Sequence, residues 1–175
     1  MRRILLLLLT VAVLTALAGV ALAAPGNIDS DVNKGLAQVR QATAKYHEAS
    51  NALADGYLPT EHCVAVPGVD GMGYHYVNPT LIGDPSVDPL KPEVLLYAPK
   101  KNGEPKLVGV EYLVVDADQD LFTEGDRPNL FGVLPFNGPM EGHEPGMPIH
   151  SDLHAWIFKG NPDGVFADFN PKVRC

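Results

Sequence analysis

Two histidines, together with the strand-like run that follows them, have the clearest capacity for chemistry in this chain. His150 and His154 stand four residues apart and lead into the apolar segment Leu153–Phe158. A spacing of four returns a side chain to the same face of a strand, and nearly to the same face of a helix. Imidazole is the commonest metal ligand and titrates near neutral pH when unperturbed. The spacing therefore predicts two imidazoles that face one space.

A glutamate and a third histidine are candidates for the same space. Glu111 lies within the apolar run Leu107–Val115, where burying a lone carboxylate is costly unless a cation or a hydrogen-bonding partner meets it. His75 follows two glycines that permit close approach of the backbone. We expect four residues to converge at one end of a sheet and to bind a divalent metal (Zn, Cu, Mn or Fe) or a small ligand: His75, Glu111, His150 and His154. The residues expected to orient these ligands are Tyr74, Tyr76, Tyr97, Tyr112 and Glu93.

The sequence also allows alternative roles for these residues. The same side chains could line a small-ligand pocket that holds no metal, or each could be a satisfied core residue, as in a hydrogen-bonded pair of His75 with Glu111. In an enzymatic version, a metal-bound water or one imidazole would act as the base. The competing class is a non-catalytic structural or interaction protein of the cell envelope, whose apolar helix stripe docks a protein partner.

The elements that must position these residues are one helix and a set of short strands. Apolar residues recur at alternating steps of four and three from Val32 to Leu53, which predicts an amphipathic helix that ends at Asp55-Gly56. Lys101-Asn102-Gly103 between two apolar runs is typical of a hairpin. The pattern predicts an α+β fold, in which the N-terminal helix packs on an antiparallel twisted sheet or a small open β-barrel. The expected strands are Cys63–Val66, Tyr74–Val77, Val94–Tyr97, Leu107–Val115, Leu130–Leu134 and Leu153–Phe158.

The N-terminus and the cysteines indicate export. Arg2 and Arg3 precede an apolar run that ends in small residues at Ala21-Leu22-Ala23, as in a cleaved signal peptide, although an uncleaved membrane anchor is the alternative. We expect a signal peptide over residues 1–23, a linker over 24–30 and one exported domain over 31–175, periplasmic or extracellular, with no membrane association after cleavage. The two cysteines, Cys63 and Cys175, predict one disulfide bond, the alternatives being free thiols or an intermolecular bridge.

The net charge of the chain indicates which binding partners are expected. The chain carries a formal net charge of −8, and no basic patch with interleaved aromatic residues is present in the sequence, so nucleic acid is not an expected partner. Asp116, Asp118 and Asp120 begin like a calcium loop, but Leu121 stands where that loop needs glycine and Arg127 where it needs glutamate. We expect a solvated acidic loop there.

Several short motifs, among them Gly71–Asn78 with its Gly-Met-Gly-Tyr-His sequence, Pro92–Tyr97 and Leu107–Tyr112, together resemble a family of small exported bacterial proteins, over most of the chain after the leader. The resemblance implies an exported protein and supplies no catalytic residues. A fainter likeness to cupins, in which His and Glu on barrel strands hold a metal, lacks the paired His-x-His, since Tyr76 and Val77 follow His75. The motifs that carry the main resemblance are Ala42–Tyr46, Ala54–Tyr57, Gly71–Asn78, Pro92–Tyr97, Leu107–Tyr112, Leu153–Trp156 and the Asn-Pro steps before Cys175.

Overall fold

The computed structural model describes residues 30–67, 70–123 and 125–175. Three helical segments come first: α1 (Ser30–Thr43), the 3-10 helix η1 (Ala44–His47) and α2 (Ala49–Ala54). A further short helix, α3 (Pro79–Ile82), lies between the second and third strands. The strands are β1 (Leu58–Ala65), β2 (Gly71–Val77), β3 (Val94–Pro99), β4 (Pro105–Val115), β5 (Asn129–Leu130), β6 (Leu134–Pro135), β7 (Asn137–Met140) and β8 (His150–Ala155).

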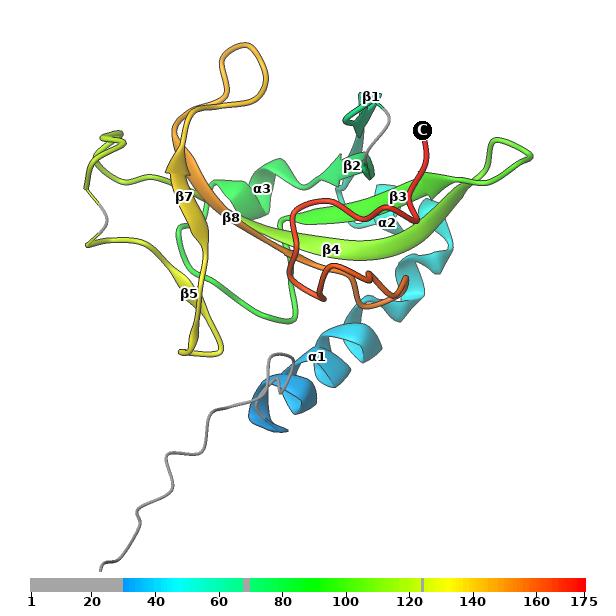
Figure 1. Ribbon diagram of the computed structural model, residues 1–175, viewed down its shortest axis with the longest axis horizontal. Coiled ribbons are helices and arrows are strands. Elements are labelled where there is room, and N and C mark those ends of the chain that lie inside the picture. The colour runs from blue at the N-terminus through cyan, green and yellow to red at the C-terminus, as the bar shows by residue number, and fades with distance from the viewer. Residues whose placement is uncertain (1–29, 68–69, 124) are drawn as a thin grey trace, which may run out of the picture.

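Six of these strands form one antiparallel sheet in the order β1-β2-β3-β4-β8-β7 (Figure 1). The sheet is open, with β1 and β7 as its edges, and β5 and β6 form a separate two-stranded pair. The α+β class is therefore confirmed, as an antiparallel sheet and not as a barrel. The predicted hairpin is also present between β3 and β4, where the Lys100 amide donates to the carbonyl of Glu104 and Gly103 adopts a φ of 83°.

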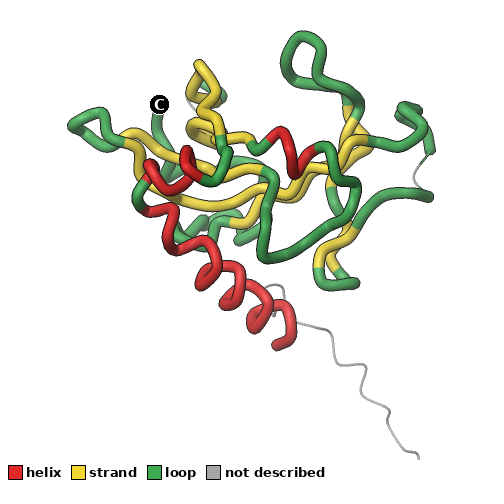
Figure 2. The backbone as a smooth tube through the Cα atoms, turned by 180° about the vertical axis from the view of Figure 1, so that it is seen from behind, coloured by secondary structure: helices red, strands yellow, loops and turns green. Residues whose placement is uncertain are grey.

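The N-terminal helical segments α1, η1 and α2 cover one face of the sheet, as the view from behind shows (Figure 2). Strand alternation turns Leu95 of β3 and Val110 of β4 toward α1, where they share a core with Val32, Leu36 and Val39. These five side chains are at most 7% exposed. Burying an aliphatic side chain of this size stabilises the fold by about 1.5–3 kcal/mol. The first half of the expected apolar stripe therefore packs on the sheet and is not free to dock a partner.

The expected single helix is interrupted, and its second half turns a different face inward. Glu48 is extended, with φ −92° and ψ 105°, between η1 and α2. Side chains satisfy two carbonyls of η1 just before this break, because the Asn51 side chain donates to the carbonyl of Lys45 and the Tyr97 hydroxyl donates to that of Tyr46. After the break the predicted apolar stripe no longer faces the core. Leu53 is 51% exposed, and Ala52 is buried instead.

The opposite face of the sheet is partly covered by the segment that follows β8. In Figure 1 this segment, drawn in red, crosses in front of β4 and β3 and ends near β1. Trp156 donates to the carbonyl of Ala167, and Asn170 pairs with Gly71 of β2. The predicted disulfide between Cys63 and Cys175 then attaches the end of the chain to β1 across 112 residues. In the chain-entropy model, closing a loop of this length stabilises a fold by about 4–5 kcal/mol.

Two strand predictions were wrong in detail. The stretch predicted as one strand over Leu130–Leu134 is a tight turn between β5 and β6, with Phe131 at φ 56° and Gly132 at φ 76°. Residues 135–148, where the sequence predicted no strand, contain β7, whose Asn-Gly-Pro-Met sequence has little strand propensity. It pairs because it lies beside β8, which is a tertiary effect.

The leader expected over residues 1–23 and most of the linker lie outside the described residues. Within the described ranges, the structure contains no helix that combines the length and the apolarity needed to cross a bilayer.

Candidate metal centre

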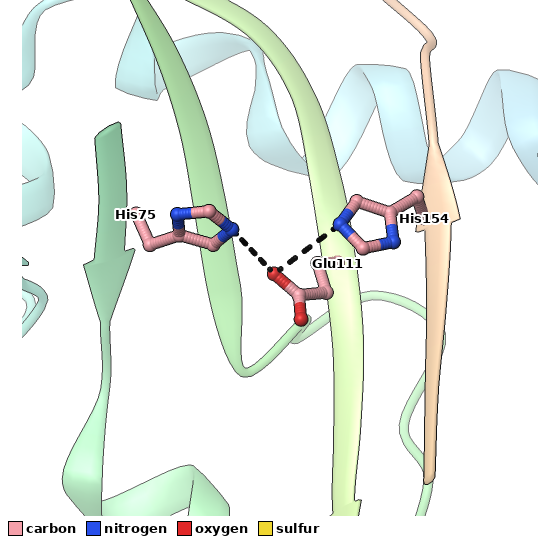
Figure 3. Close-up of side chains that lie close together, drawn as sticks. All are labelled: His75, Glu111 and His154. Atoms are coloured by element: carbon pink, nitrogen blue, oxygen red, sulfur yellow. Dashed lines mark ion pairs between the residues drawn. The ribbon is translucent and has the colours of Figure 1, made fainter. Parts of the chain in front are cut away.

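Three of the four predicted ligands come together on the face of the sheet opposite α1, η1 and α2. His75 is on β2, Glu111 on β4 and His154 on β8. Glu111 and His154 are directly opposed partners in the β4–β8 ladder, so their side chains project from neighbouring positions. His75 lies across β3, opposite Leu96, and its ring reaches toward Glu111. Figure 3 shows both imidazoles pointing at the carboxylate between them.

The distances within this group match those between ligands of one ion. His75 Nε2 lies 3.3 Å and His154 Nε2 3.8 Å from the same oxygen, Glu111 Oε2. One ligand atom from each residue lies within 4.8 Å of the other two. Ligands that are each about 2.1 Å from a tetrahedral zinc ion stand roughly 3.4 Å from one another. The three ligand atoms therefore lie close enough together to contact one metal ion.

Burial makes this group costly unless a ligand meets it. The side chains of Glu111 and His154 are 6% and 1% exposed, and that of His75 is 15% exposed. Glu111 Oε2 and both ring nitrogens of His154 are buried and have no protein hydrogen-bond partner among the described residues. Leaving a buried polar group unsatisfied costs about 1–3 kcal/mol. This cost is the feature that a bound cation would remove.

Burial shifts the pKa of each residue in the group toward its uncharged form. Burial, aided by the charges of Asp152 and Glu93, holds the pKa of Glu111 well above its usual range. Burial and the nearby His143 lower the pKa of His75 to about 4. Burial, and then His75 and His143, lower the pKa of His154 to about 3. Both imidazoles are thus neutral at physiological pH, which is the form that binds metals.

The group forms one side of a pocket of about 350 Å³. Strand β1 contributes to the rim through an irregularity in its pairing with β2 between Pro59 and Cys63. In this bulge the Thr60 hydroxyl accepts the backbone N–H of His75, and His62 also lines the pocket. Bulges commonly re-aim side chains next to functional sites. The loop between β7 and β8 adds His143, Glu144 and Met147 to the opposite rim.

His150 does not join the group, although it shares a face of β8 with His154. Its ring lies against that of His143, with ring centroids 5.0 Å apart, and its Nδ1 is 3.1 Å from the carbonyl of Pro148. The reason is the rise of a strand, since four residues span about 13 Å and ligands of one ion must lie within a few ångströms. A spacing of four gives a shared face on a strand but adjacency only on a helix.

The predicted orienting residues also lie elsewhere. Tyr97 and Tyr112 belong to the core on the helix-covered face and donate to the carbonyls of Tyr46 and Pro89. Tyr74 and Tyr76 pack against the same core. Glu93 accepts the Leu113 amide at the edge of that core, and burial raises its pKa to about 7. Strand alternation explains this outcome for Tyr74 and Tyr76, which flank His75 and so face away from it.

Two acidic residues that the sequence reasoning missed stand beside His154 instead. Asp152 and Asp168 each place a carboxylate oxygen within 4.8 Å of a ring nitrogen of His154. Asp152 lines the pocket, and burial together with Asp168 raises its pKa to about 7. Neither carboxylate makes a hydrogen bond to a ring nitrogen of His154, so the two are further candidate ligands around this ring. Asp152 could have been found from the sequence, because it alternates with His150 and His154 on one face of a strand.

The acidic loop also contains a cluster of carboxylates. Asp116, Asp118 and Asp126 bring one oxygen each within 4.8 Å of one another. Asp118 and Asp126 are exposed, and amide hydrogen bonds from Asp120 hold Asp116 and Asp118. Because two of its three carboxylates are exposed to water, this group is a weaker candidate for a metal site than the group at Glu111.

Comparisons of the chain with protein-family models, with curated proteins and with solved structures gave no match. The resemblance to exported bacterial proteins therefore stays a prediction.

Proposed function

We propose that this protein binds a divalent transition metal, Zn, Cu, Mn or Fe, through His75, Glu111 and His154. The observation that carries the proposal is the geometry of one orphaned oxygen, Glu111 Oε2, with a histidine Nε2 at 3.3 Å and another at 3.8 Å. Two imidazoles and one carboxylate suit all four metals, because imidazole and carboxylate are ligands that each of them accepts. The donor set contains no thiolate, since both cysteines are in the disulfide.

The number of protein ligands favours a site that binds or activates a small molecule over a site that only stabilises the fold. Structural zinc sites are closed by four protein ligands, whereas sites that bind or activate a small molecule keep at least one position open. Three ligands from this chain would leave that position facing the pocket. The disulfide and the apolar leader support export as the setting in which the site operates.

The alternative of an interaction module loses its main support. That proposal depended on an exposed apolar stripe along the helices, and the stripe residues Val32, Leu36 and Val39 are buried against the sheet. A convergent and enclosed group of ligands is the arrangement that favours ligand chemistry.

The test is metal content with two histidine variants. The purified protein is stripped with a chelator, loaded with Co(II) and freed of excess metal, and bound cobalt is then measured by elemental analysis and visible absorption. We expect one equivalent in the wild type and in the control His47→Ala, whose exposed ring packs against Phe158 and does not line the pocket. His75→Ala should lose the cobalt. Absence of stoichiometric metal in the wild type, or equal loss in the two variants, would contradict the proposal.

A further inference from the structure

The pocket beside the metal group is larger than a metal-bound water needs. Its volume is about 350 Å³, which corresponds to roughly ten water molecules at the volume each occupies in the liquid. Pockets for small organic molecules begin at about 300 Å³. The space next to the open coordination position therefore has room for an organic ligand.

One wall of the pocket is apolar and belongs to a continuous apolar cluster. Val94 and Leu113 are buried at its floor, and the partly buried side chains Val77, Ile82 and Met147 pack against them. These five residues come from β2, α3, β3, β4 and the loop before β8, so the wall is formed only by the tertiary fold. A wall of this composition favours a hydrocarbon group, because each square ångström of apolar surface removed from water contributes about 25 cal/mol.

Local structure holds this wall in position. The Asn78 side chain accepts the amides of Thr80 and Leu81 and so caps α3, which carries Ile82. On the other side of the pocket, Gly142 allows the loop to fold tightly, because a Cβ at this position would overlap the carbonyl of Met147. Ile82 and Met147 are therefore held in position by local structure that does not involve the metal ligands.

The charges around the pocket restrict the head group of the ligand. Among the described residues that line the pocket there is no lysine or arginine, and two residues besides the proposed ligand Glu111 are acidic, Glu144 and Asp152. Phosphates and other multiply charged anions would meet like charges here without a cationic side chain to bind them. A neutral or singly charged head group with oxygen donors fits the open metal position better.

We infer that the pocket binds a small amphiphilic organic molecule, which places an oxygen-donor head on the metal held by His75, Glu111 and His154 and a hydrocarbon body against the apolar wall. This inference rests on the proposed metal site. It goes further because it names the ligand by chemical class, and because the hydrocarbon part can be tested separately from the metal.

The test compares two hydroxamates that share one head group and differ in chain length. Acetohydroxamate and hexanohydroxamate are titrated into the Co(II)-loaded protein by calorimetry, while visible absorption reports contact of the head group with the metal. We expect the longer compound to bind at least tenfold more tightly, a difference of about 1.4 kcal/mol. Neither compound should bind the metal-free protein with comparable affinity, and inorganic phosphate should not displace them.

Two variants of the wall and one control locate the effect. Ile82→Gln and Met147→Gln are at partly buried positions that tolerate a polar side chain, and each should reduce the preference for the longer compound to less than about threefold. Leu90→Gln, at a position 47% exposed and away from the pocket lining, should retain it. Equal affinities in the cobalt-loaded wild type, equal binding without metal, or loss in all three variants would overturn the inference. A protein that takes up no cobalt would instead refute the metal site itself.

Discussion

Replacing Glu111 by glutamine should make the metal-free protein more stable and the metal-loaded protein less stable. Without metal, Glu111 Oε2 faces two imidazole nitrogens and makes no hydrogen bond to either. An ionised carboxylate cannot donate to those nitrogens, whereas the amide of glutamine can, so the variant loses the cost of an unsatisfied buried group at pH values where Glu111 is ionised. We expect it to gain about 1–3 kcal/mol in the free energy of unfolding.

Metal should reverse that order. A ligand present at a thousandfold excess over its Kd stabilises the folded state by about 4 kcal/mol, provided that the unfolded chain does not bind it. The wild type should show a gain of this size with Zn(II) or Co(II). The Glu111→Gln variant should gain less than about 1 kcal/mol, because a neutral amide oxygen replaces the anionic ligand.

The pH dependence of the difference follows from the direction of the Glu111 pKa shift. Its folded-state pKa is raised, so its contribution to stability is present below the unfolded pKa and is lost as pH rises through the folded pKa. The advantage of the metal-free glutamine variant should therefore be larger at about pH 8 than at about pH 5. The histidine contributions have the opposite sign and are lost as pH falls below about 6.5, but they are present in both proteins and should largely cancel in the comparison.

The assay is urea unfolding with the disulfide intact, in a chelator and in excess metal. It is followed by the fluorescence of Trp156, the one tryptophan, whose ring stacks on that of His154. Glu104→Gln, an exposed hairpin position, is the control and should change stability by less than about 0.5 kcal/mol. If Glu111→Gln destabilises the metal-free protein and metal affects neither protein, Glu111 is a structural partner of His75 and the reasoning fails.

Further outcomes follow from the same structure. His154→Ala should abolish cobalt binding, whereas His150→Ala, on the same face of the same strand, should retain it, as measured by bound cobalt. Zinc affinity measured between about pH 5 and pH 8 should rise with pH, because Glu111 must lose a proton to bind metal and the imidazoles are already neutral there. Cys175→Ser should lower the free energy of urea unfolding by about 2–5 kcal/mol. Gly142→Ala should leave cobalt binding intact and weaken hexanohydroxamate binding, because it displaces the loop that forms part of the pocket wall.

Sequence periodicity predicts those features that depend on local alternation. It correctly identified the helix up to Tyr46, the hairpin at Gly103 and the inward position of Glu111 on its strand. The disulfide was predictable from cysteine number and the expected compartment alone. In each case the physical cause lies within a few neighbouring residues or in the chemistry of one residue type.

What the sequence could not predict depends on distance and on partners remote in the chain. Alternation says that His150 and His154 share a face, but the ladder determines that only His154 lies opposite Glu111. The break at Glu48 depends on a hydroxyl from Tyr97, which is about fifty residues away. The apolar pocket wall could not be inferred either, because Ile82 and Met147 meet there only after the sheet has formed.

The architecture also explains how the chain tolerates an unsatisfied group at its centre. The face of the sheet toward the helices is fully packed, and its core residues are joined by buried tyrosine hydroxyls bonded to backbone carbonyls. The other face is closed at one end by Trp156 and Val173 and by the disulfide at Cys175, which together hold the C-terminal segment over the strands. Stability is therefore supplied on both sides of the ligand group without using it. The unsatisfied atoms of the group cost free energy when no ligand is bound, and a ligand that satisfied them would recover that cost.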